Sequence, residues 1–217
     1  MKITVLCTAT EHPVWQALLE WTKLMSAEGN STVLVSHVDD AVGGDFLFLV
    51  SCSTIVSANV RSRYRFNLVL HASDLPTGRG WSPYIHEVLA GADHLTMTLL
   101  EAEDALDSGA IWLKTKIPLQ GHELLADILE KIIQAEIALM NRAVTEYATI
   151  QPMKQSSSAA SYYPRRTPAD SELDTGKTIA DQMNLLRVVD NQRFPAYFRL
   201  NGRRYRLQIE DEGPDEK

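Results

Sequence analysis

The sequence has few cysteines and no excess of basic residues. Its 217 residues include two Cys, and 21 Lys and Arg stand against 28 Asp and Glu, for a formal net charge of −7. Nonspecific binding to nucleic acid depends on clustered basic side chains that displace counterions from the phosphates. The small arginine clusters at 61–65, 165–166 and 203–206 instead suit one phosphate-bearing small molecule, so we expect no nucleic-acid partner.

Long apolar runs are also missing. None approaches the ~20 residues of a membrane-spanning helix, and the first residues have the pattern of a strand rather than of a signal peptide. Cys7 and Cys52 lie in strand-like runs without the spacing of a metal site, which is typical of buried thiols in a reducing compartment. No dinucleotide- or ATP-binding motif occurs. We therefore expect a cytoplasmic protein with no metal and no membrane partner.

Strand-like and helical segments alternate along the first 147 residues. Strands are predicted at 3–8, 32–36, 45–51, 68–71, 95–100 and 110–117, and helices at 14–25, 55–64, 84–90 and 123–147. This order predicts an α/β fold: an open, mostly parallel, Rossmann-like sheet with helices on both faces.

The composition changes near residue 150 to Gln, Ser, Lys and Pro, which predicts a surface linker up to residue 161. A helix at 178–188 follows, and Asn201-Gly202 between two alternating runs predicts a β-hairpin. We therefore divide the chain into a domain at 1–150 and a C-terminal extension at 151–217. An edge strand of the hairpin could pair with a second copy, so we expect a homodimer.

One histidine and one aspartate stand out by their positions. His71 ends an apolar strand and opens a loop rich in Gly and Pro, and Asp107 belongs to a second such loop about 35 residues on. Ligands of open α/β sheets bind at the carboxyl ends of strands, and an imidazole beside a carboxylate is suited to acid–base chemistry. Without further context, His71 would be a satisfied strand-end histidine and Asp107 a turn residue.

Two motifs in order carry a resemblance to a known family. They read His71-x-Ser73-x-Leu75-Pro76-x-x-Arg79-Gly80-x-x-Pro83 and, after Thr98, Leu106-Asp107-x-Gly109. This pattern resembles the catalytic domain of the formyltransferases that use N10-formyltetrahydrofolate. The resemblance extends over about residues 45–120. In the first 45 residues only the order of strand and helix is similar.

The segment after the linker points to one branch of that family. Tyr162-Tyr163-Pro164-Arg165-Arg166-Thr167-Pro168-x-Asp170-Ser171-x-x-Asp174 resembles short bacterial enzymes that formylate nucleotide-linked amino-deoxysugars of surface polysaccharides. The enzyme that acts on methionyl-tRNA carries a C-terminal β-barrel of about 100 residues, and the about 50 residues that remain here are too few for it.

The resemblance implies roles for individual residues. His71 would donate to the oxyanion formed during transfer, which can contribute ~3 kcal/mol, and Asp107 would orient it and act as base. N10-formyltetrahydrofolate would bind between the segment 51–55 and the loop 101–107. The contacts that we assign to this folate are Ser53, Ile55, Leu75 and Asp104. The acidic residues of the loop could equally be a solvated surface.

The acceptor would meet a separate set of side chains. Tyr162 and Tyr163 would stack on a nucleobase or sugar, and Arg165 and Arg166 would hold a diphosphate. The alternative is an amphipathic segment that packs back over the domain. Arg79 has two interpretations, a phosphate contact or an ion pair that holds the loop.

The sequence departs from the family pattern at one strand position. The family has an Asn two residues before the histidine, where this chain has Val69. Asn67 would sit ~6.6 Å further back along a strand, which is too far to replace it. Asp74 stands where the family commonly has an apolar residue. Two alternatives therefore stay open. The first is a different enzyme, either a formyltransferase with another amine acceptor or a hydrolase that releases formate. The second is a homologue that binds folate or a nucleotide without turnover.

Overall fold

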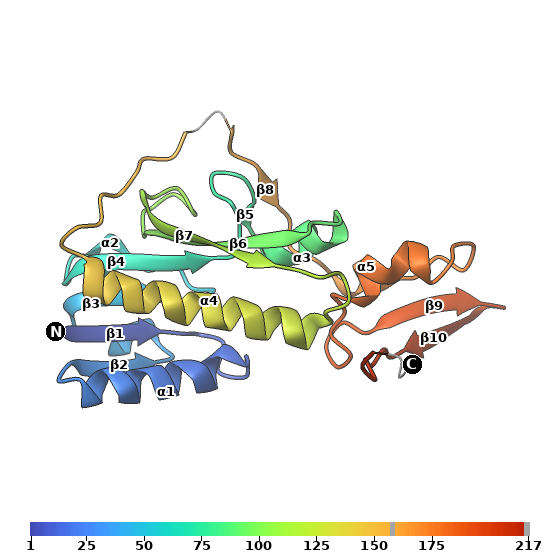
Figure 1. Cartoon of the computed structure of the whole chain (residues 1–217), viewed down its shortest axis with the longest axis horizontal. Coiled ribbons are helices and arrows are strands. Elements are labelled where there is room, and N and C mark those ends of the chain that lie inside the picture. The colour runs from blue at the N-terminus through green and yellow to red at the C-terminus, as the bar shows by residue number, and fades with distance from the viewer. Residues whose placement is uncertain (157–158, 215–217) are drawn as a thin grey trace.

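A six-stranded sheet organises the computed structural model, which describes residues 1–156 and 159–214 (Figure 1). In the order β2-β1-β3-β4-β6-β7, the strands are Ser31–Val35, Lys2–Leu6, Gly44–Leu49, Tyr64–His71, His94–Glu101 and Ile111–Pro118. Strands β1 to β4 pair in parallel, whereas β6 runs antiparallel to both β4 and β7. The predicted mostly parallel α/β sheet is confirmed, with an antiparallel pair at one edge.

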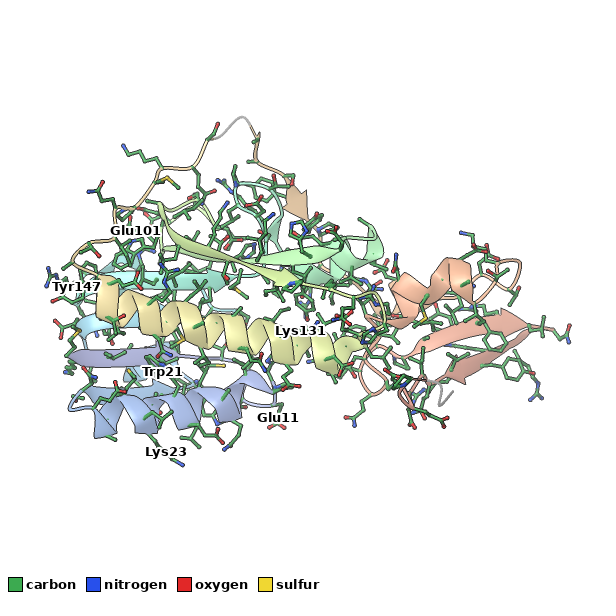
Figure 2. The ribbon with its side chains drawn as sticks, viewed as in Figure 1. Glu11, Trp21, Lys23, Glu101, Lys131 and Tyr147 are labelled. Carbon is green, nitrogen blue, oxygen red and sulfur yellow. The ribbon has the colours of Figure 1, made fainter. Side chains whose placement is uncertain are left out.

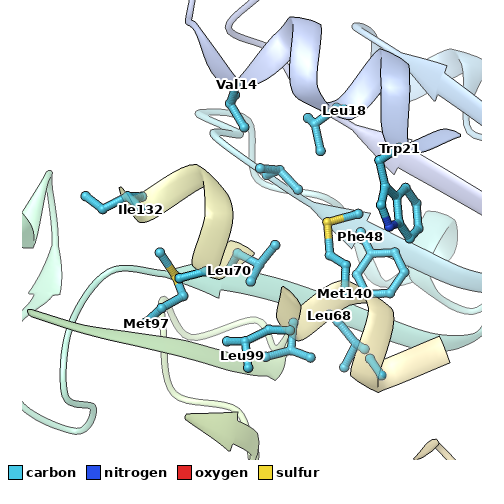
Figure 3. Close-up of a cluster of buried hydrophobic side chains, with 14 of the residues drawn as sticks. Val14, Leu18, Trp21, Phe48, Leu68, Leu70, Met97, Leu99, Ile132 and Met140 are labelled. Carbon is cyan, nitrogen blue, oxygen red and sulfur yellow. The ribbon is translucent and has the colours of Figure 1, made fainter. Parts of the chain in front are cut away.

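The longer helices α1 (Val14–Ala27), α3 (Pro83–Leu89) and α4 (Leu125–Glu146) share one face of the sheet. Figure 3 shows Trp21 of α1 and Met140 of α4 beside Phe48 of β3, in the main apolar core. The other face is covered by shorter pieces, α2 (Ala58–Arg61) and the 3₁₀ turn η1 (Val38–Asp40), over a smaller cluster. Because β3 is buried on both faces, it reads as a continuous apolar run.

The helix predicted at 55–64 is only one turn long. α2 stops at Arg61, and β4 begins at Tyr64, seven residues before His71 and earlier than the sequence suggested. The register of β4 on β3 explains the longer strand, since Tyr64 pairs with Gly44 and Phe66 with Phe46. Pairing with a neighbouring strand decides the conformation of residues whose own pattern was ambiguous.

A segment that we call the return segment (residues 151–163, of which 157–158 lie outside the described residues) leads back from α4 across the sheet (Figure 1). Met153 forms an isolated bridge with Ile111 at the start of β7. At the other end, β8 (Tyr162–Tyr163) pairs in parallel with β5 (Arg79–Gly80). The predicted linker therefore carries the Met153 bridge, and the strand pairing of β8 begins just after its last residue.

The C-terminal elements form a small unit beside α4. They are η3 (Pro168–Ser171), η4 (Ala180–Gln182), α5 (Met183–Leu186), β9 (Ala196–Leu200) and β10 (Arg203–Leu207). The predicted hairpin is present, and its turn places Asn201 and Gly202 at φ 50° and 73°, as a two-residue turn requires. The helix expected at 178–188 is instead a 3₁₀ turn followed by α5, because the Gln182 amide bonds to the backbone at residues 174 and 178.

A buried ion cluster joins this unit to the sheet domain. Glu123, just before α4, accepts hydrogen bonds from Lys131 and from Arg187, which follows α5. Figure 2 shows Lys131 towards the end of α4 that faces the C-terminal elements, with Tyr147 at the far end. The division into residues 1–150 and 151–217 stays a prediction. In the described part of the chain, no helix is both long and apolar enough to cross a membrane.

One carboxyl lies inside the main core. Glu136 of α4 is 6% exposed, and burial raises its pKa to about 8. The neutral acid is therefore the form that the folded protein favours. The stability that this group contributes is present at low pH and is lost as the pH rises from the ordinary glutamate pKa towards 8.

We expect Glu136→Gln to remove this pH dependence. Between pH 6 and pH 8 the wild-type protein should lose on the order of 2 kcal/mol of unfolding free energy more than the variant. Urea unfolding at the two pH values measures the difference. Glu130→Gln, at an exposed position of the same helix, is the matched control. Equal pH dependence of wild type and Glu136→Gln would contradict the assignment.

Candidate active site

The end of β4 is fixed by its neighbour in the sheet. His71, the last residue of β4, pairs with Thr98 of β6. The Thr98 hydroxyl donates to the carbonyl of Ser73 at 2.7 Å, and the Ser73 N–H donates to the carbonyl of His71. The chain therefore turns sharply after His71, and the turn itself is buried.

The His71 ring is held at one nitrogen. Nε2 lies 2.9 Å from the carbonyl oxygen of Gly78, and the side chain is 9% exposed. Since a carbonyl oxygen only accepts, Nε2 carries the proton. Nδ1 is thereby directed towards Asp107, and its distance to Asp107 Oδ1 is 3.7 Å. This is longer than a hydrogen bond, so it is Gly78 that fixes the ring tautomer.

Asp107 reaches the histidine from the loop between β6 and β7, not from the end of a parallel strand. Its side chain is 7% exposed, and Oδ2 accepts the N–H of Gly80 at 3.0 Å. Asp107 has φ 51°, a left-handed conformation. Gly109 is required nearby, because a Cβ there would lie 1.9 Å from the carbonyl oxygen of Glu101. The structure thus brings together the two residues that the sequence paired.

Arg79 is enclosed rather than open to a ligand. It is 8% exposed, its NH2 donates to Gln155 at 2.7 Å and its NH1 to the hydroxyl of Tyr162 at 3.4 Å. These contacts support the loop-holding interpretation over a phosphate contact. The partner of Arg79 is Gln155, a neutral amide of the return segment rather than a carboxylate, and no motif in the sequence marks this residue.

Val69 and Asp74 are the positions near His71 where the sequence departs from the family pattern, and these two and Asn67 each have a different environment. Val69 packs against Leu75, Leu100 and Ile111 in a small apolar cluster. Asn67 does not reach the site, and its buried Oδ1 has no hydrogen-bond partner among the described residues. Asp74 forms an ion pair with Lys114 of β7, and the same ammonium donates to the carbonyl of residue 75. Asp74 therefore ties the loop after His71 to the sheet.

The residues assigned to the folate lie on two adjoining loops, with one exception. Ile55 is 78% exposed, and Ser53 is fastened to Thr8 by hydrogen bonds. Arg61 joins the two loops: NH1 donates to the carbonyl of Val56, and NH2 to Asp104. Leu75 is the exception, because its side chain is 1% exposed within the cluster around Val69. In the sequence Arg61 belongs only to a small basic cluster, and a helix of four residues gives no pattern that would point to its contact with Asp104.

The residues assigned to the acceptor divide into exposed and packed side chains. Tyr162 is 63% exposed, whereas Tyr163 stacks on His86 at 4.5 Å between ring centroids. Arg165 is exposed and lies over the Trp81 ring, at 4.9 Å from its centroid. Arg166 donates to the carbonyl of residue 170. The pairing of β5 with β8 brings Trp81 and His86 beside this segment.

Comparison with known proteins identifies relatives of this arrangement. A family model described as formyl transferase matches residues 8–144. Methionyl-tRNA formyltransferase of Acidiphilium cryptum is 27% identical over 119 residues, which are 55% of this chain and 39% of that protein. The chain thus spans less than half the length of this curated relative.

Solved structures share the fold over 98% to 100% of this chain. Methionyl-tRNA formyltransferase from Clostridium thermocellum has a TM-score of 0.81 at 17% identity and covers 98% of this chain and 94% of its own. A sugar N-formyltransferase from a Shewanella species has a TM-score of 0.68 at 16% identity, with 99% of both chains covered. HypX from Aquifex aeolicus, in complex with tetrahydrofolic acid, has a TM-score of 0.78 at 19% identity and covers 100% of this chain and 39% of its own.

Proposed function

Because this chain belongs to the formyl transferase family, we propose that it transfers a formyl group from N10-formyltetrahydrofolate to the amine of a nucleotide-linked amino-deoxysugar. The observation that carries the transfer step is the pairing of His71 with Asp107. Both side chains are at least nine-tenths buried, 3.7 Å apart, and each is held at one atom by backbone. This leaves one nitrogen of the imidazole and one oxygen of the carboxylate for chemistry.

The reaction uses those two atoms in turn. The acceptor amine attacks the formyl carbon, a new C–N bond forms and the formyl oxygen becomes an oxyanion. His71 in its imidazolium form, with the Asp107 carboxylate as counterion, donates from Nδ1 to that oxygen while Nε2 keeps its bond to Gly78. Asp107 Oδ1 takes the proton from the acceptor nitrogen. The formyl C=O then re-forms as the bond from the formyl carbon to N10 breaks, and N10 leaves with the proton that Asp107 took from the acceptor nitrogen.

The folate would lie between the loop after β3 and the loop after β6. The two loops are joined through Arg61, and the exposed Ile55 and Leu106 offer apolar surface for a flat pterin. The complex of HypX with tetrahydrofolic acid supports this class of co-substrate. In this arrangement Asp104 holds the two loops together through its ion pair with Arg61. Leu75 supports Val69 from within the apolar cluster and does not contact the folate.

The acceptor would approach from the side of the return segment. Tyr162 offers an exposed ring, and Arg165 with Trp81 offers a cation next to an aromatic face, which together suit a nucleobase and its phosphates. The net charge of −7 disfavours a large RNA acceptor. The Shewanella sugar N-formyltransferase shares the fold over 99% of both chains, and the Clostridium thermocellum methionyl-tRNA formyltransferase shares it over 98% of this chain and 94% of its own. The proposal of a sugar acceptor therefore rests on these side chains and on the net charge.

The direct test is a panel of acceptors. The protein is incubated with N10-formyltetrahydrofolate and either nucleotide-linked amino sugars, methionyl-tRNA or a purine ribonucleotide precursor amine. Mass spectrometry should show the gain of one formyl group on an amino sugar. Transfer to methionyl-tRNA or to the purine precursor would overturn the acceptor assignment. Release of formate without transfer would support a hydrolase, and folate binding without either reaction would support a binding module.

We expect His71→Asn and Asp107→Asn each to lower kcat/KM by about 10²- to 10³-fold, because each removes an interaction made with the transition state. Steady-state kinetics with the accepted sugar measures this loss. His122→Asn, at an exposed histidine, should leave the rate unchanged. Turnover of His71→Asn at the wild-type rate would end the proposed mechanism.

We also propose a homodimer formed through the C-terminal hairpin. In the described chain β10 pairs only with β9, and Leu200 and Tyr205 of the hairpin are 49% and 43% exposed. A free edge with apolar side chains favours pairing with a second copy. Light scattering at micromolar concentration should give about twice the chain mass of 24.3 kDa, and Tyr205→Asp should lower it. A monomer mass for the wild type would contradict this expectation.

A further inference from the structure

We propose that Gln155 of the return segment is a positioning residue that sets the carboxylate of Asp107 for formyl transfer, and that Arg79 in turn sets Gln155. This inference rests on the proposed function for its kinetic consequence. Its structural part, the fixing of Asp107, stands on contacts alone and can be measured without turnover.

Both the nitrogen and the oxygen of the Gln155 side-chain amide form hydrogen bonds. Nε2 donates to the carbonyl oxygen of Asp107 at 2.9 Å and to that of Gly109 at 2.8 Å. Oε1 accepts from Arg79 at 2.7 Å. One side chain therefore bridges two carbonyls of the catalytic loop, 48 and 46 positions away in sequence, and a buried guanidinium.

The catalytic loop needs such a restraint. Asp107 holds the left-handed conformation, φ 51°, which a non-glycine residue adopts at a cost of about 1 kcal/mol. Within the loop between β6 and β7, the Ser108 hydroxyl bonds to the carbonyl of Ala105. This local bond cannot by itself orient Asp107 towards His71. The two bonds from Gln155 fix the backbone on both sides of Ser108, and so fix the direction in which the Asp107 side chain leaves it.

The same residues form a closed ring of contacts. Asp107 bonds through its carboxylate to the N–H of Gly80 and through its carbonyl to Gln155. Gln155 bonds to Arg79, which is the chain neighbour of Gly80. Both ends of Asp107 are thus tied to adjacent residues of β5. A shift of Gln155 would release the carbonyl of Asp107 and loosen the position of its carboxylate.

The backbone of β5 provides a reporter for this ring. The N–H groups of Arg79 and Trp81 point to the return segment and donate to the carbonyls of residues 161 and 163. The N–H of Gly80 points the opposite way, to Asp107 Oδ2. Amide exchange at Gly80 therefore reports on the Asp107 carboxylate, whereas exchange at Trp81 reports on the pairing of β5 with β8.

The kinetic test compares Gln155→Ala and Gln155→Glu with the wild type. Glu keeps an acceptor for Arg79 but cannot donate to the carbonyls of Asp107 and Gly109. We expect kcat to fall by about 10- to 100-fold in both variants, with KM changed less than threefold, because a small misplacement of a reacting group costs rate rather than affinity. Lys154→Ala, at the exposed neighbouring position, is the control and should match the wild type.

The structural test is amide exchange followed by NMR in the same variants. We expect protection at Gly80 to fall at least tenfold while protection at Trp81 changes little. Equal loss at both amides would mean that Gln155 only stabilises the return segment, and unchanged protection at Gly80 with unchanged kcat would overturn the proposal outright. If the wild type transfers no formyl group to any acceptor, the proposed function fails, and the exchange result still decides whether Gln155 positions Asp107.

Discussion

The hydrogen bond from the Gly80 N–H to the Asp107 carboxylate joins two loops that follow the neighbouring, antiparallel strands β4 and β6. One loop follows β4 and carries the histidine, and the other connects β6 to β7. Each loop alone has few internal hydrogen bonds. The Asp107 carboxylate and the His71 ring are instead held by contacts to Gly80 and Gly78. The return segment adds the remaining restraints, because β8 pairs with β5 and Gln155 bonds to the loop of Asp107. The site is therefore a product of three chain segments, and its geometry depends on all of them.

The replacement of an amide by Val69 changes how this site would work. The valine packs against an apolar cluster of Leu75, Leu100 and Ile111, so an apolar side chain stands where an amide would offer a hydrogen-bond donor. Asn67, further back on β4, cannot serve the reacting atoms. The stabilisation of a developing negative charge then depends on the His71 ring alone, and Asp107 supports it by balancing the positive charge of that ring. A site with fewer donors places a greater demand on their alignment, which is consistent with the number of backbone bonds that hold the two side chains.

The sequence predicted the sheet, the long helices and the terminal hairpin. The spacing of apolar residues along each strand and helix and the Asn201-Gly202 turn are local signals. It also predicted the pairing of His71 with Asp107, from two motifs read together. It missed the antiparallel direction of β6, since the direction of a buried strand leaves no mark in its composition. The enclosure of Arg79 and the contacts of Gln155 left no local signal either, because they join residues 46 to 83 positions apart in sequence. Such contacts follow from the fold and not from any local pattern.

The most direct measurement of the central claim is a crystal structure of the protein with a folate analogue that carries an unreactive formyl group at N10. The account predicts the formyl oxygen within about 3 Å of His71 Nδ1, a distance at which that nitrogen can donate. It also predicts that Asp107 keeps its bond to Gly80 while its free oxygen faces the formyl carbon. A formyl group bound away from His71, or an Asp107 carboxylate turned away from the histidine, would contradict it.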